Sequence, residues 1–121
     1  MTRLHHVNVT CRPDETERVA EFYQDVLGLV PMPKVAGTDP RGAWFAIDEL
    51  SQLHVSERDS TVHRDAHFAL VVDDLPEVIE RLERGAHEWR SADPVFGGGR
   101  GFTRDPAGNR IELLERAGSI R

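Results

Sequence analysis

The chain contains the same pattern twice, and this internal repeat is the feature that most constrains its fold. The opening segment 4–9 is similar to segment 66–71, and the segment 53–58 is similar to segment 111–116. Residues 3–10 alternate apolar and polar side chains, which is typical of a β-strand with one buried face, and we read the other three segments as strands too. The repeat therefore predicts two modules built on one plan and related by pseudo-symmetry.

At 121 residues the chain has the usual size of one domain. Either half alone would bury little apolar surface, so we expect two fused half-domains rather than two independent ones. We predict a single domain, residues 1–121, made of a first module at 1–60 and a second at 64–117.

Both halves predict the order β-α-β-β-β. A stripe of apolar residues at helical spacing follows the opening strand of each half, and Gly28 or Gly85 ends each helix. The stripes are Val19, Phe22, Tyr23, Val26 and Leu27 in the first half, and Leu75, Val78, Ile79 and Leu82 in the second. The predicted fold class is α+β, with two βαβββ modules that form a curved, partly open mixed sheet.

The composition of the chain limits which kinds of molecule it is expected to bind. A net charge of −6 argues against nucleic acid or an anionic membrane as the main partner and leaves a small molecule. Cys11 is the only cysteine, so the chain has no internal disulfide, as expected in a reducing compartment. The sequence contains neither a signal-peptide core nor an apolar run of membrane-spanning length, and we predict a cytoplasmic protein.

The repeat also aligns four residues that are able to bind a metal. His6 aligns with His67, and His54 aligns with Glu112. Strand alternation places all four on the sheet face opposite the apolar residues, where Gln52 could take the role of His54. Two histidines and a carboxylate suit Fe(II) and related ions, so the predicted cofactor is a divalent metal: Fe, Mn, Ni, Co or Zn.

Three motifs give the chain a family resemblance. They are Leu4-His5-His6-Val7, the helix end Phe22-Tyr23-Gln24-Asp25-Val26-Leu27-Gly28-Leu29, and the turn and strand Asp105-Pro106-Ala107-Gly108-Asn109-Arg110-Ile111-Glu112-Leu113. With them the chain resembles the vicinal oxygen chelate superfamily, which includes glyoxalase I, fosfomycin-resistance enzymes, extradiol dioxygenases and bleomycin-resistance proteins. The resemblance covers nearly the whole chain.

The resemblance implies roles for individual residues. His6, His67 and Glu112 match the metal ligands that the first, fifth and eighth strands contribute in these enzymes. His54 stands where a glyoxalase I usually carries Glu, so it is either a fourth ligand or a substrate contact. In short two-module members the site commonly forms between paired subunits, which implies a homodimer.

The leading functional hypothesis is a metal-dependent lyase, isomerase or transferase that activates a small oxygen-chelating metabolite by Lewis-acid chemistry. Glu112 and His54 are the predicted catalytic residues, and Arg100, in a mobile glycine-rich loop, is the predicted substrate-binding residue. No organic cofactor is predicted. A metal-free protein that binds an antibiotic, as bleomycin-resistance proteins do, is the alternative, and an Fe(II)-dependent dioxygenase is a third.

Overall fold

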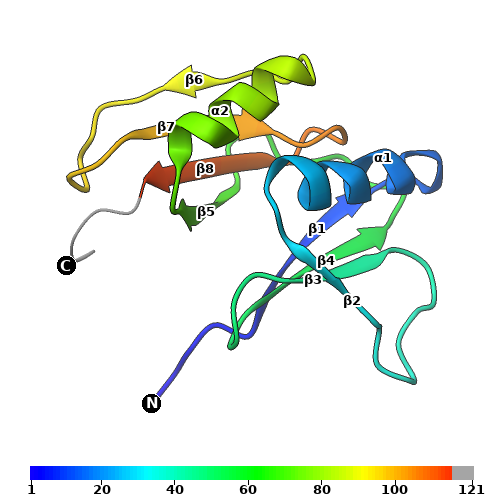
Figure 1. Cartoon of the computed structure of the whole chain (residues 1–121). Helices are drawn as coiled ribbons and strands as arrows, with labels where there is room; N and C mark the ends of the chain where they lie inside the picture. The colour runs from blue at the N-terminus through cyan, green and yellow to red at the C-terminus, as the bar shows by residue number, and fades with distance from the viewer. Residues whose placement is uncertain (116–121) are drawn as a thin grey trace. The chain divides into compact units, whose positions relative to one another are not determined.

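The chain divides into two compact units, Met1–Val62 and His63–Arg121, in a computed structural model that describes residues 1–115 (Figure 1). Residues 116 and 117 of the predicted second module lie outside this described part. No helix among residues 1–115 is both long enough and apolar enough to cross a membrane.

The first unit is an open four-stranded mixed sheet with one helical segment. Its strands lie in the order β1-β4-β3-β2, with β1 parallel to β4 and the other neighbours antiparallel. Pro31 lies in the edge strand β2, where its missing N–H disturbs the sheet least. The elements are β1 (His6–Cys11), η1 (Pro13–Glu15), α1 (Thr16–Glu21), η2 (Phe22–Val26), β2 (Val30–Met32), β3 (Ala43–Ala46) and β4 (Gln52–Glu57).

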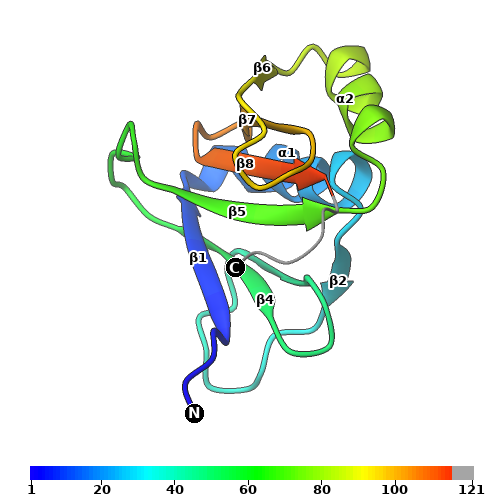
Figure 2. The ribbon, with the colours of Figure 1, turned by 90° about the vertical axis from the view of Figure 1, so that its left-hand side faces the viewer.

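The second unit repeats this topology, with strand order β5-β8-β7-β6 and β5 parallel to β8 (Figure 2). Its helix begins where the Asp74 side chain accepts a hydrogen bond from the Glu77 backbone N–H, the usual role of an aspartate cap. The elements are β5 (His67–Val72), α2 (Leu75–Arg84), β6 (Arg90–Ser91), β7 (Arg100–Arg104) and β8 (Arg110–Glu115). The predicted α+β class and βαβββ order are confirmed in both units.

The helical segment of the first unit differs from the single helix that its apolar stripe predicts. A 3₁₀ turn, a short α-helix and a π-helical turn follow one another, and the Leu27 N–H bonds to the Phe22 carbonyl at 3.2 Å. At its start the Glu15 carboxylate accepts the Arg12 backbone N–H at 2.9 Å. Gly28, with φ of 74°, ends the segment as predicted.

The predicted helical stripes are buried except for Ile79 of α2, which is half-buried. The helical stripe of the first unit is buried, and Tyr23 lies 6.0 Å from Phe45, ring centroid to centroid. In both units the last strand buries its second and fourth residues, Leu53 and Val55 in β4 and Ile111 and Leu113 in β8. The helices and sheets are thus joined by apolar packing, the main favourable contribution to folding.

The turn between β7 and β8 is fixed by side chains. Asp105 accepts the backbone N–H groups of Ala107 and Asn109 at 2.9 and 3.0 Å, and the Asn109 side chain donates to its other oxygen at 2.8 Å. Both side chains are buried, and Gly108 has φ of 96°. This network determines where β8 begins.

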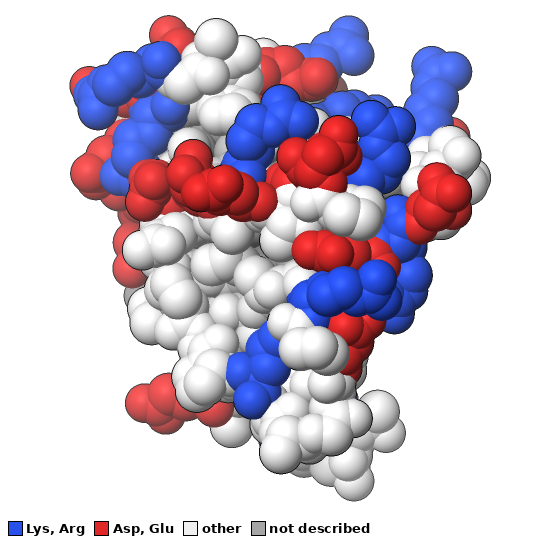
Figure 3. Space-filling view, turned by 90° about the vertical axis from the view of Figure 1, so that its right-hand side faces the viewer, with Lys and Arg blue, Asp and Glu red and all other residues white. Residues whose placement is uncertain are grey.

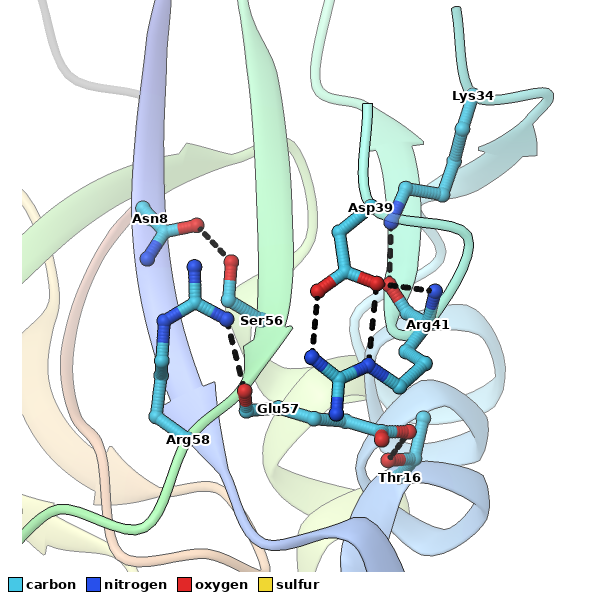
Figure 4. Close-up of polar contacts among 8 residues, drawn as sticks. All are labelled: Asn8, Thr16, Lys34, Asp39, Arg41, Ser56, Glu57 and Arg58. Atoms are coloured by element: carbon cyan, nitrogen blue, oxygen red, sulfur yellow. Dashed lines mark hydrogen bonds and ion pairs between the residues drawn. The ribbon is translucent and has the colours of Figure 1, made fainter. Parts of the chain in front are cut away.

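The connection between β2 and β3 is held by a local ion pair (Figure 4). The Arg41 guanidinium donates to both carboxylate oxygens of Asp39, at 2.8 and 3.1 Å, and lowers the pKa of Asp39 well below its ordinary value. Lys34 donates to the Arg41 carbonyl. This connection ends at Gly42, whose φ is 88° and where an added Cβ would lie 2.1 Å from the Val55 carbonyl oxygen.

We therefore predict that Gly42→Ala is more destabilising than Gly37→Ala. Gly37 also has a positive φ, 91°, but has no atom within 4 Å of an added Cβ. Gly37→Ala should cost roughly 1–2 kcal/mol from backbone strain alone, and Gly42→Ala roughly 2 kcal/mol more from the clash. Urea unfolding of both variants measures the difference, and equal losses would contradict the assignment of the clash.

Candidate functional site

The second unit contains a histidine and a carboxylate in direct contact. His67 begins β5, Glu112 is the third residue of β8, and His67 Nε2 lies 3.2 Å from Glu112 Oε1. The parallel register pairs Ala69, not His67, with Glu112, so the two side chains meet across the pair of strands. Glu112 is 6% exposed, which is unusual for a carboxylate unless it is paired.

The second oxygen of Glu112 is held by Arg100. Arg100 Nε donates to Glu112 Oε2 at 2.6 Å, and its Nη1 donates to the Asp93 carbonyl at 3.2 Å. Arg100 is the first residue of β7, so its predicted place in a mobile loop is wrong. The glycine-rich segment predicts that the loop includes residue 100, but the pairing of β7 with β8 already begins at Arg100, which lies opposite Leu114. The carboxylate is consequently oriented by a charge-assisted hydrogen bond on one oxygen while the other faces His67.

The equivalent positions of the first unit hold an aromatic stack. The His54 ring lies between the rings of His6 and Trp44, with both centroid separations 4.0 Å and interplanar angles of 16° and 1°. The register is the same as in the second unit, because Asn8 pairs with His54 as Ala69 pairs with Glu112. One chain thus carries two different chemistries at equivalent points of its repeat.

His54 is a neutral, buried imidazole. Burial lowers the pKa of His54 to about 4 from its ordinary value of 6.5, with repulsion from His6 and His5 as smaller causes. Its Nε2 lies 2.8 Å from Gln52 Oε1 and, with the amide in this orientation, donates its proton there. The unprotonated Nδ1 then carries the lone pair that a ligand would use.

Two donor atoms of the second unit have the separation that a shared divalent metal would require. Metal–ligand bonds of about 2.0–2.2 Å place adjacent ligand atoms roughly 3.0–3.4 Å apart, and His67 Nε2 and Glu112 Oε1 have this separation. In the first unit, stacked rings direct their nitrogens side by side rather than toward one point, so His6 and His54 could share an ion only if one ring turned. Within either unit, residues 1–62 or 63–115, no three His, Cys, Asp or Glu side chains form a metal-binding group.

Two aromatic residues take part that the sequence did not assign to the site. Trp44 pairs with His54 across β3 and β4 and covers the histidine ring. Phe102 pairs with Glu112 across β7 and β8 and meets the His67 ring edge-on at 5.5 Å. The alternation of β3 was the available signal, because Phe45 already occupies the core-facing position between two outward residues.

Comparison with known proteins places the chain in a family. Residues 8–114 match the family model described as a glyoxalase-like domain. The chain belongs to this glyoxalase-like family. The family lies within the vicinal oxygen chelate superfamily that the three motifs resemble, so that prediction is confirmed. A comparison with curated proteins gave no match.

Solved structures share the glyoxalase-like fold. A protein from Bacillus anthracis described as of the glyoxalase family is 25% identical, with a TM-score of 0.84 and 97% of each chain covered. A mutant of the fosfomycin-resistance protein FosX from Listeria monocytogenes, in complex with Mn(II) and 1S,2S-dihydroxypropylphosphonic acid, is 17% identical, with a TM-score of 0.80 and coverage of 100% and 97%. TnmS3, an antibiotic-binding protein from Streptomyces, is 17% identical, with a TM-score of 0.72 and coverage of 97% and 98%.

We predict that the indole of Trp44 keeps His54 neutral. In metal-free protein, Trp44→Ala should hydrate the His54 ring and raise its pKa from about 4 toward 6.5, because burial is the main cause of the shift. Trp44→Phe, which retains an aromatic cover, should leave the pKa close to its original value. An NMR titration of the histidine ring resonances measures both variants, and an unchanged pKa in Trp44→Ala would refute the role of the indole.

Proposed function

We propose that the chain is a divalent-metal-dependent enzyme, a lyase, isomerase or transferase that acts on a small oxygen-chelating molecule. The observation that carries this proposal is the contact between His67 Nε2 and Glu112 Oε1, whose 3.2 Å separation suits two ligands of one ion. His6, His67 and Glu112 are the proposed ligands, and the FosX complex with Mn(II) supports a metal in this fold. A bound metal would supply Lewis-acid polarisation of a substrate oxygen.

The residues around the proposed ligands have separate tasks. Arg100 holds Glu112 Oε2 and so leaves Oε1 directed at His67. His54 is proposed as a substrate contact rather than a fourth ligand, because its stacking between two rings fixes it in a plane parallel to His6. A neutral imidazole there can accept or donate a proton at a substrate hydroxyl, and Glu112 is the proposed carboxylate for proton transfer.

The second candidate is a non-catalytic binding protein for a planar or aromatic small molecule. Its support is the stack of Trp44, His54 and His6, a set of flat surfaces of the kind that bind planar ligands, and the antibiotic-binding neighbour of the same fold. Turnover distinguishes the two candidates. Oxygen consumption by iron-loaded protein with catechols would distinguish a dioxygenase, and sedimentation of the metal-loaded protein tests the proposed homodimer.

We predict that His67→Ala and Glu112→Gln each abolish tight metal binding. Protein stripped with a chelator is titrated with Mn(II), Fe(II), Co(II), Ni(II) and Zn(II) by calorimetry, and each variant should weaken binding of the preferred ion at least about 100-fold. His87→Gln removes a histidine from outside the candidate site and is the matched control, expected to bind as the parent does. If the parent and all three variants bind the metal with equal affinity, the proposed metal site is wrong.

We further predict that Arg100→Gln lowers metal affinity by about 10–100-fold, the usual loss when a partner that orients a ligand is removed. Arg84→Gln, which breaks only an exposed pair with Glu80, should leave affinity unchanged. An undiminished affinity in Arg100→Gln, in protein that folds normally by circular dichroism, would show that Arg100 does not position Glu112.

A further inference from the structure

A basic pocket lies within the second unit, beside the strands that carry His67 and Glu112. Its volume is about 320 Å³, within the usual range for small-molecule sites. Phe102 lines it together with four arginines, Arg64, Arg90, Arg104 and Arg110. On the face drawn in Figure 3, acidic and basic side chains lie among one another where charges occur, and a broad area carries neither.

Two of these arginines oppose each other directly. Arg104 of β7 and Arg110 of β8 are register partners, and both are half-buried. Like charges placed opposite each other on neighbouring strands are destabilising. An anion bound between them would remove this repulsion, so the pair fits a ligand of negative charge.

Both guanidinium groups are held in place before any ligand binds. Arg104 donates to the carbonyl oxygens of Gly108 and Arg64 at 2.9 and 3.0 Å. The Arg110 guanidinium lies 4.0 Å from the centre of the Phe102 ring, close enough for a cation–π contact. A preorganised pair loses less side-chain entropy on binding than two mobile surface arginines would.

The acidic residues at the pocket do not neutralise it. Asp65 and Glu88 also line the cavity, but among residues 63–115 none of the four arginines forms an ion pair with a carboxylate. Four positive charges against two negative ones leave an excess of two, whereas the whole chain carries −6. Local basic character of this kind selects anionic small molecules.

We propose that this pocket binds a tetrahedral or planar oxyanion, namely the phosphate, phosphonate or carboxylate group of the substrate. Arg110 is the register partner of His67, so the pocket adjoins the proposed metal ligands on β5 and β8. Guanidinium groups bind such oxyanions by paired, charge-assisted hydrogen bonds. Only the identification of the anion as part of the substrate rests on the proposed function.

Inorganic phosphate is the probe for this pocket. Chelator-treated protein at low ionic strength is titrated with phosphate and followed by NMR, with chloride at matched ionic strength as the reference. Backbone resonances of 64, 90, 104 and 110 should shift with saturation for phosphate and not for chloride. The double variant Arg90→Gln/Arg110→Gln should weaken phosphate binding at least about tenfold, as expected for the loss of charge-assisted hydrogen bonds.

Arg84→Gln is the matched control, because it removes an arginine of the same unit whose partner Glu80 lies on α2, and its phosphate affinity should equal that of the parent. Shifts that do not saturate, or equal affinity in the double variant, would overturn the proposal. Phosphate binding is measured on metal-free protein, so the two proposals fail separately. If the protein binds phosphate but no metal, the anion pocket is supported and the metal-dependent function is wrong. If it binds metal but not phosphate, the anion pocket is wrong and the metal-dependent function is unaffected.

Discussion

The parallel pairing of the first and last strands is the interaction on which each unit depends. It joins segments about 45 residues apart, His6 with Gln52 and His67 with Arg110, and all the other strands are added to this pair. Apolar side chains between the strands and the helix stabilise one face, and the same alternation places His54 and Glu112, themselves covered by neighbouring side chains, on the opposite face. A candidate site on that face is therefore a by-product of the way the core is formed.

Much of this could be predicted from the sequence, because repeat, alternation and helical spacing are local patterns. They fix the strand order along the chain, the buried stripes and the equivalence of His6 with His67 and of His54 with Glu112. The side-chain contacts between neighbouring strands could not be predicted from the sequence. Arg100 reaches Glu112, and Trp44 covers His54, only through the pairing of a third strand, whose register depends on turns and not on composition. The change from 3₁₀ to α to π geometry after Pro13 likewise depends on packing rather than on propensity.

His54 stands where a glyoxalase I usually carries Glu, and the surroundings of His54 give a physical reason for this difference. A carboxylate at this position would need a cationic partner of the kind that Arg100 provides for Glu112. An imidazole can instead be buried uncharged between aromatic rings, and Trp44 is present to cover it. The two units thus keep one backbone plan but use different means to bury a polar group, an ion pair in one and a stack in the other.

The Asp105–Asn109 turn limits how a chain of this design can diversify. Its hydrogen bonds fix the first residue of β8, and a shift of one residue would turn Glu112 toward the core and Ile111 outward. Insertions or deletions there would exchange the two faces of the strand. Changes in length disturb the paired strands least in the longer connections, 33–42, 58–66 and 92–99, so new ligand specificities can arise from these loops while the turn stays constant.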